Sequence, residues 1–173
     1  MKCIWLVLIL AAASSCNKPV RGKNGVSYKN PVEYNDYIVR RQTKLMNNIL
    51  EFGKMAGVNH DSAEALLYRY VGETEKMIGD INDMPPYKGD SSLRDAAINS
   101  FIFYKRVFNQ DYMEIISIRK KEPGMTDADM ARINQILENI REQEEGLFRT
   151  FRQAQIDFAA EHRMELKENT MKQ

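Results

Sequence analysis

Apolar residues recur at steps of three and four along four stretches of the chain, with polar residues between them. This period is that of an amphipathic α-helix, and no strand-like alternation of apolar and polar residues persists anywhere. The pattern therefore predicts an all-α fold. Because the loops between the stretches are short, it favours an up-down-up-down four-helix bundle over residues 30–165.

Each predicted helix has its own start and stop signals. Ser, Thr, Asn or Asp is expected at the N-cap, and Gly or Pro at or beyond the end. The expected N-caps are, in chain order, Asn30, Asp61, Asp90 or Ser91, and Thr126. The expected ends are Gly57, Pro85-Pro86, Pro123-Gly124 and His162. These boundaries make the third and fourth helices the longest.

Unequal lengths have a consequence at the far end of the bundle. At 1.5 Å per residue, the two long helices should extend roughly 10 Å beyond the first two. Apolar side chains there would lack covering neighbours, which predicts a partner or self-association surface at this distal tip. Its expected residues are Ile115, Ile116, Ile118, Met125, Met130 and Ile133. Two alternatives are that the long helices cover one another as a hairpin, or that the third helix breaks near Asn109.

Four polar residues fall on or beside the apolar stripes: Arg41, Thr74, Tyr104 and Glu144. Three interpretations stay open. The side chains sit at stripe edges with their polar ends in water. Alternatively, a polar layer linking Arg41 and Glu144 fixes the helix register. The third interpretation is that they line a pocket between the helices for a small or lipidic ligand.

Charge and residue inventory exclude several classes of protein. The chain has 25 Lys and Arg against 24 Asp and Glu, so it lacks the basic excess of a nucleic-acid binder. Its two histidines, His60 and His162, have no Glu three residues before them, as di-iron bundles require. There is no Gly-rich phosphate loop, and no serine or cysteine is placed to pair with a histidine. We therefore predict a protein without metal or cofactor that is not an enzyme.

The first sixteen residues carry the most specific motif. After Met1-Lys2, residues 3–13 are uniformly apolar, which is too short for the roughly 20 residues of a membrane-spanning helix and suits a signal peptide. The segment Ala13-Ser14-Ser15-Cys16 then resembles the lipobox of bacterial lipoproteins. That resemblance implies a signal peptide of residues 1–15, cleavage before Cys16, and acyl chains on Cys16 that anchor the protein in a membrane.

Residues after the cysteine bear on location. In the gram-negative sorting system that the resemblance brings in, an aspartate next to the cysteine retains a lipoprotein at the inner membrane. Asn17 stands there instead, which favours the outer membrane and leaves its periplasmic or surface face open.

Residues 16–29 are expected to form a flexible basic tether. They contain no acid and few apolar residues. Their four cations are Lys18, Arg21, Lys23 and Lys29. A coil of this length reaches about 20 Å. The cations either contact anionic headgroups, or the tether is a solvated spacer.

Several segments resemble a family of small all-helical surface lipoproteins: residues 30–37, Lys88-Gly89-Asp90, Leu93-Arg94-Asp95, and Phe151 with 155–159. The resemblance implies a helical protein anchored outside the cell and assigns no catalytic residue. The sequence thus predicts a non-enzymatic interaction or structural module of the cell envelope, followed by a C-terminal tail of residues 166–173. The alternative is a ligand- or lipid-binding protein.

Overall fold

A computed structural model describes residues 18–165, and this part of the chain is mostly helical. The predicted all-α layout of four helices is confirmed. Cys16 and the tail 166–173 lie outside the described residues. Within residues 18–165, no helix is both long and apolar enough to cross a membrane.

The elements follow one another along the chain with short connections. A small hairpin comes first, formed by β1 (Val20–Arg21), the 3₁₀ turn η1 (Lys23–Gly25) and β2 (Ser27–Tyr28). The helices are α1 (Pro31–Ala56), α2 (His60–Asn82), α3 (Ser92–Arg106), the π-helical turn η2 (Val107–Asp111), α4 (Tyr112–Arg119) and α5 (Asp127–Glu161). Because α3, η2 and α4 are contiguous, they form the third of the four helices.

Helix starts agree with the predicted caps at three of the four positions and differ at the second helix; Ser91 is the N-cap of α3, although its side chain makes no capping hydrogen bond. The Asn30 side chain accepts a hydrogen bond from the Glu33 amide at 2.9 Å, and Thr126 forms a complete capping box with Asp129. At α2 the expected cap Asp61 is wrong. Asn59 is the N-cap, because its side chain accepts from the Ser62 amide at 2.8 Å.

The third helix does not break near Asn109. It widens there into the π-helical turn η2 and then resumes as α4. Such a turn adds a residue to the backbone ring and shifts the side chains that follow relative to the preceding turns.

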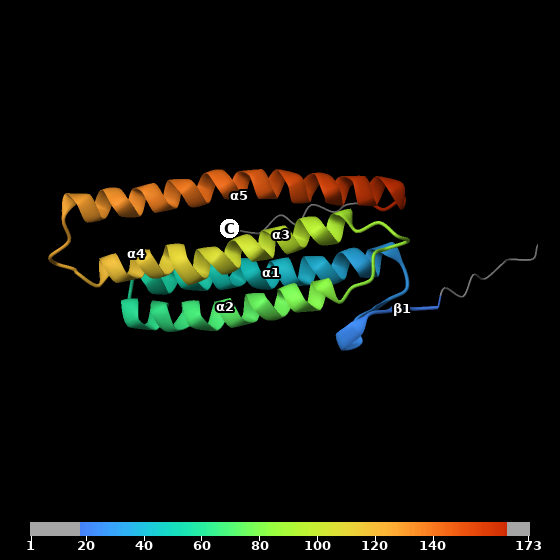
Figure 1. Cartoon of the computed structure of the whole chain (residues 1–173), viewed down its shortest axis with the longest axis horizontal. Helices are drawn as coiled ribbons and strands as arrows, with labels where there is room; N and C mark the ends of the chain where they lie inside the picture. The colour runs from blue at the N-terminus through green and yellow to red at the C-terminus, as the bar shows by residue number, and fades with distance from the viewer. Residues whose placement is uncertain (1–17, 166–173) are drawn as a thin grey trace, which may run out of the picture.

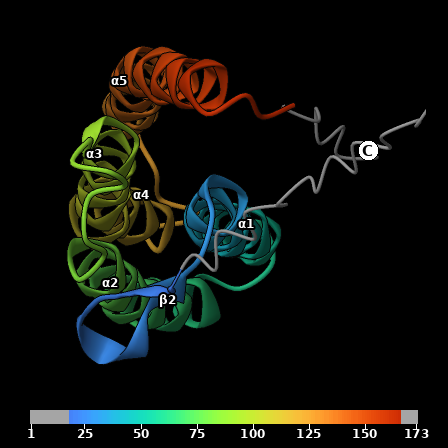
Figure 2. The same ribbon diagram turned by 90° about the vertical axis from the view of Figure 1, so that its right-hand side faces the viewer.

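The four helices lie side by side along the long axis of the molecule (Figure 1). Viewed end-on, α5, α3 with α4, and α2 follow one another across the molecule, and α1 lies beside α2 (Figure 2). The packing pairs are α1 with α2, α2 with α3 and α4, and α5 with α3 and α4. The chain enters α1 at the end where α2 and α5 finish.

Two apolar clusters fill the interior. The larger joins α1, α2 and α3 to the C-terminal half of α5 and contains most of the buried aromatic rings. The smaller is rich in isoleucine and joins the end of α3 and α4 to the first turns of α5.

The expected flexible tether is wrong for residues 20–28, which we call the N-terminal hairpin. Its strands pair antiparallel, with Val20 opposite Tyr28. Val26 and Tyr28 are buried in the larger cluster, and the Tyr28 hydroxyl donates to the Pro85 carbonyl. Burial of these two side chains stabilises a segment whose composition alone is typical of a coil.

Candidate functional site

Tyr104 and Glu144 meet between α3 and α5, where the Tyr104 hydroxyl donates to the Glu144 carboxylate. Both side chains are partly buried. Burial, and then the hydrogen bond to Glu144, raise the pKa of Tyr104 far above its ordinary value. Burial also raises the pKa of Tyr112 to about 12, with a smaller contribution from the Glu144 charge. Both phenols therefore stay protonated at neutral pH, and Tyr104 acts as a donor that links two helices.

Arg41 lies on α1 and bonds to residues of α1 and α2. Its guanidinium donates to the Asp80 carboxylate at 2.8 Å and to the Tyr37 carbonyl at 3.0 Å. Its Cζ atom also lies 3.5 Å from the centre of the Tyr37 ring. Together with Lys76 and Gly79, these residues line a shallow surface depression. Arg41 is thus paired with Asp80 and not with Glu144.

Thr74 is fully buried, and its hydroxyl has no hydrogen-bond partner among the described residues. The four predicted polar residues therefore do not share one contact. The structure joins Tyr104 to Glu144, pairs Arg41 with Asp80, which sequence reasoning missed, and buries Thr74 without a hydrogen-bond partner among the described residues.

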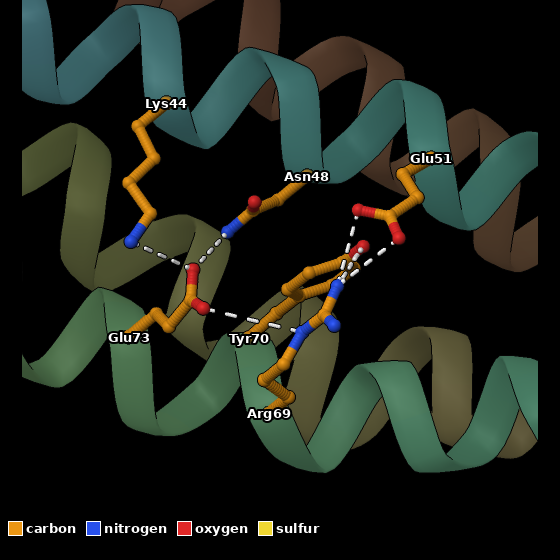
Figure 3. A network of polar contacts seen from close by, with 6 residues as sticks. All are labelled: Lys44, Asn48, Glu51, Arg69, Tyr70 and Glu73. Carbon is orange, nitrogen blue, oxygen red and sulfur yellow. Dashed lines mark hydrogen bonds and ion pairs between the residues drawn. The ribbon is translucent and has the colours of Figure 1, made fainter.

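A polar network between α1 and α2 also escaped the sequence analysis (Figure 3). Its centre is Glu73, whose carboxylate accepts from the buried Asn48 amide at 3.0 Å and pairs with the Lys44 ammonium at 3.2 Å. Burial opposes the charged carboxylate, but these two partners together lower the pKa of Glu73.

The same network continues one turn along α2 at Arg69 (Figure 3). One guanidinium nitrogen donates to both Glu51 carboxylate oxygens and to the Tyr70 hydroxyl, each at 3.1 Å. Hydrogen bonds from Tyr70 and Arg69 lower the pKa of the exposed Glu51. Burial raises the pKa of Tyr70 to about 12. The network's two cations, on Lys44 and Arg69, balance its two anions, on Glu51 and Glu73. It therefore has no excess charge to offer a ligand. Its contacts between the helices can align α1 with α2.

One signal in the sequence pointed to this network. Lys44, Asn48 and Glu51 on α1, and Arg69 with Glu73 on α2, follow helical spacing of three and four residues. This spacing places each set on one face of its helix. It does not say that the two faces meet.

The predicted distal surface is mostly covered, which corrects the expectation that its residues lack neighbours. Ile115, Ile116, Ile118 and Ile133 are all less than a tenth exposed. Met125 is half-buried, and Met130 is 40% exposed. The long helices cover one another in part, because Ile115, Ile118 and Ile133 pack in the smaller cluster between α4 and α5. Ile116 belongs instead to the larger cluster, and α4 also packs against α2.

Aromatic rings close the opposite end of the body. Tyr34 packs on Tyr28 and Phe158, and Tyr87 packs on Phe158 and His162, with ring centres 4.8–5.5 Å apart. Two buried polar atoms, Tyr34 Oη and His162 Nε2, have no hydrogen-bond partner among residues 18–165.

Metal binding has no ready donor set in the described part of the chain, where no group of three or more His, Cys, Asp or Glu side chains converges. Cys16, the predicted lipidation site, lies outside that part. Comparisons of the chain with protein-family models, curated proteins and solved structures found no match. The resemblance to helical lipoproteins therefore rests on the motifs in the sequence.

Proposed function

We propose that this protein is a membrane-anchored lipoprotein of the bacterial cell envelope, whose helical body is a non-enzymatic interaction or structural module. The single observation that carries the proposal is the apolar segment 3–13 followed by Ala13-Ser14-Ser15-Cys16. Acyl chains on Cys16 would hold the chain at a bilayer, since two or three chains together bind firmly. Asn17 favours the outer membrane.

In this proposal the four helices form an up-down-up-down bundle, with a protein partner or a second copy of the chain bound to its exposed surface. The contacts between neighbouring helices and the side-by-side arrangement in Figure 1 support this topology. Polar side chains at the helix interfaces bond to one another, as Tyr104 does to Glu144 and Arg41 to Asp80. That use of polar groups favours a structural role over catalysis.

Mass spectrometry of the protein purified from native membranes tests the anchor. We expect the N-terminal residue to be Cys16 carrying a diacylglyceryl thioether, and a Cys16→Ser variant to leave the membrane fraction. An unmodified thiol on a water-soluble native protein would contradict the proposal.

The interaction role needs a separate test. Chemical crosslinking in native membranes, compared with the same treatment of a Cys16→Ser chain, should yield a defined adduct only in the anchored protein. A body that stays strictly monomeric and uncrosslinked in the membrane would count against an interaction module.

A further inference from the structure

The N-terminal hairpin has a fixed direction relative to the helices. Val26 and Tyr28 are 3% and 1% exposed, so one side of the hairpin is part of the core. Gly22 lies so close to α2 that a Cβ atom there would come within 2.0 Å of the Asp83 carbonyl oxygen. Gly25 makes the tip with a φ of +75°, which favours glycine. A segment packed this way presents a defined set of side chains to the outside.

Those outward side chains are basic. Arg21 and Lys23 on the hairpin, and Lys18 and Lys29 directly beside it, are exposed. Residues 18–29 contain no Asp or Glu. Val20 adds an apolar side chain that is 41% exposed. The chain as a whole is nearly neutral, so this concentration of positive charge is a local property of the hairpin.

The hairpin is also the described element closest in sequence to the predicted lipid. Cys16 precedes Val20 by four residues, so a chain segment between them spans at most about 14 Å. Figures 1 and 2 place the hairpin at the end of the molecule where α1 begins. Acyl chains on Cys16 would therefore keep the hairpin within about one or two Debye lengths of the headgroups.

We propose that the N-terminal hairpin, with Lys18 and Lys29, is a second membrane contact that binds anionic lipid headgroups. This inference rests on the proposed lipidation of Cys16, which would place the hairpin near the bilayer. Each Lys or Arg at an anionic surface strengthens binding about fivefold. Because the hairpin is packed on the helices, this contact also orients the body, which a flexible tether does not do.

Vesicle co-sedimentation of the unlipidated chain tests the contact directly. The protein is the chain from residue 16 onwards with Cys16→Ser, and the vesicles are phosphatidylcholine alone or an equal mixture with phosphatidylglycerol. We expect binding to the anionic vesicles only, and its loss at high salt, where charges are screened.

Two double variants with the same change in net charge separate a local contact from general attraction. Arg21→Glu with Lys23→Glu should weaken binding to anionic vesicles at least about tenfold. Lys54→Glu with Lys76→Glu alters exposed lysines of α1 and α2 and should retain binding within about twofold. Thermal unfolding of both variants verifies that each is folded.

Equal loss in the two double variants, or no preference for anionic vesicles, would overturn the hairpin contact. Neither result bears on the proposed lipid anchor, because acylation of Cys16 is measured separately, from the mass of the native protein. Conversely, a native protein without acyl chains would refute the anchor even if the unlipidated chain binds anionic vesicles.

Discussion

The two ends of the helical body are both closed, but by different side chains. At the end where α1 begins, the rings of Tyr28, Tyr34, Tyr87 and Phe158 pack together with His162. At the distal end, isoleucines of α4 and α5 cover one another. The sequence pattern predicts a loose tether at the first end and an exposed apolar tip at the second. Both expectations underestimate burial, because other elements of the fold cover these side chains.

Polar atoms make the two ends physically different. Rings with hydroxyl and imidazole groups close the first end, and two of their polar atoms are buried without a hydrogen bond in the described residues. The smaller, isoleucine-rich cluster at the distal end has no such groups among its fully buried members. Substitutions at the aromatic end should therefore change stability in either direction, whereas truncations at the distal end should only destabilise.

The largest effect is expected at Phe158, which is 3% exposed and contacts three other rings. Phe158→Ala should lower the free energy of unfolding by about 3–5 kcal/mol. Ile156, two residues earlier on α5, is 41% exposed. Ile156→Ala should change the free energy of unfolding by less than about 0.5 kcal/mol. Urea denaturation measures both. Similar values for the two variants would mean that the rings do not close this end.

At the distal end, Ile133→Ala should cost about 2–5 kcal/mol, because the side chain is 1% exposed within the smaller cluster. Met130→Ala removes a side chain of the same predicted surface that is 40% exposed, and a loss below about 1 kcal/mol is expected. The same denaturation experiment compares them. If Ile133→Ala is as mild as Met130→Ala, the distal tip is open after all.

Docking of the N-terminal hairpin can be tested with a pair of glycines. Gly22→Ala places a methyl group against the Asp83 carbonyl and should destabilise the protein by about 1–3 kcal/mol. Gly53→Ala, in the exposed part of α1 with open space around it, should stabilise by about 0.5–1 kcal/mol. Opposite signs in thermal unfolding are the expected outcome. A neutral Gly22→Ala would show that the hairpin is not held against α2.

The smallest effects come from removing single hydroxyl groups at the aromatic end. Tyr28→Phe deletes the donor to Pro85 and should destabilise by about 1 kcal/mol. Tyr34→Phe deletes a buried hydroxyl without a partner and should leave stability unchanged or raise it by up to about 1 kcal/mol. The measurement is the midpoint of urea unfolding, compared between variants whose free energy of unfolding depends on urea concentration with the same slope. A loss of stability in Tyr34→Phe would reveal a hydrogen bond to that hydroxyl.

The candidate polar contacts show how far sequence reasoning reached. It selected Tyr104 and Glu144 because each interrupts an apolar stripe, and the structure joins them. It selected Arg41 for the same reason but not its partner Asp80, which is a half-buried residue of α2. The contact between Asn48 and Glu73 was missed because a polar residue type gives no sign in the sequence that its side chain is buried, as Asn48 is, or half-buried, as Glu73 is.

Local information in the sequence was sufficient to predict the four helices. Apolar spacing, the N-caps Asn30 and Thr126 and the stop at Gly57 act within one or two turns, so they are visible in any short window. The lipobox resemblance at Cys16 is likewise a property of neighbouring residues.

Only the tertiary structure decided which side chains are buried at the two ends and which polar groups meet. Tyr28 packs on Tyr34 and also contacts Tyr87 and the Pro85 carbonyl, more than fifty positions away, and Ile133 is covered by α4 across a loop. Burial depends on the surface that a partner helix supplies, and helical periodicity determines a face without determining its neighbour. That is why a segment with the composition of a tether is a packed hairpin, and why a tip with the composition of an interface is part of the core.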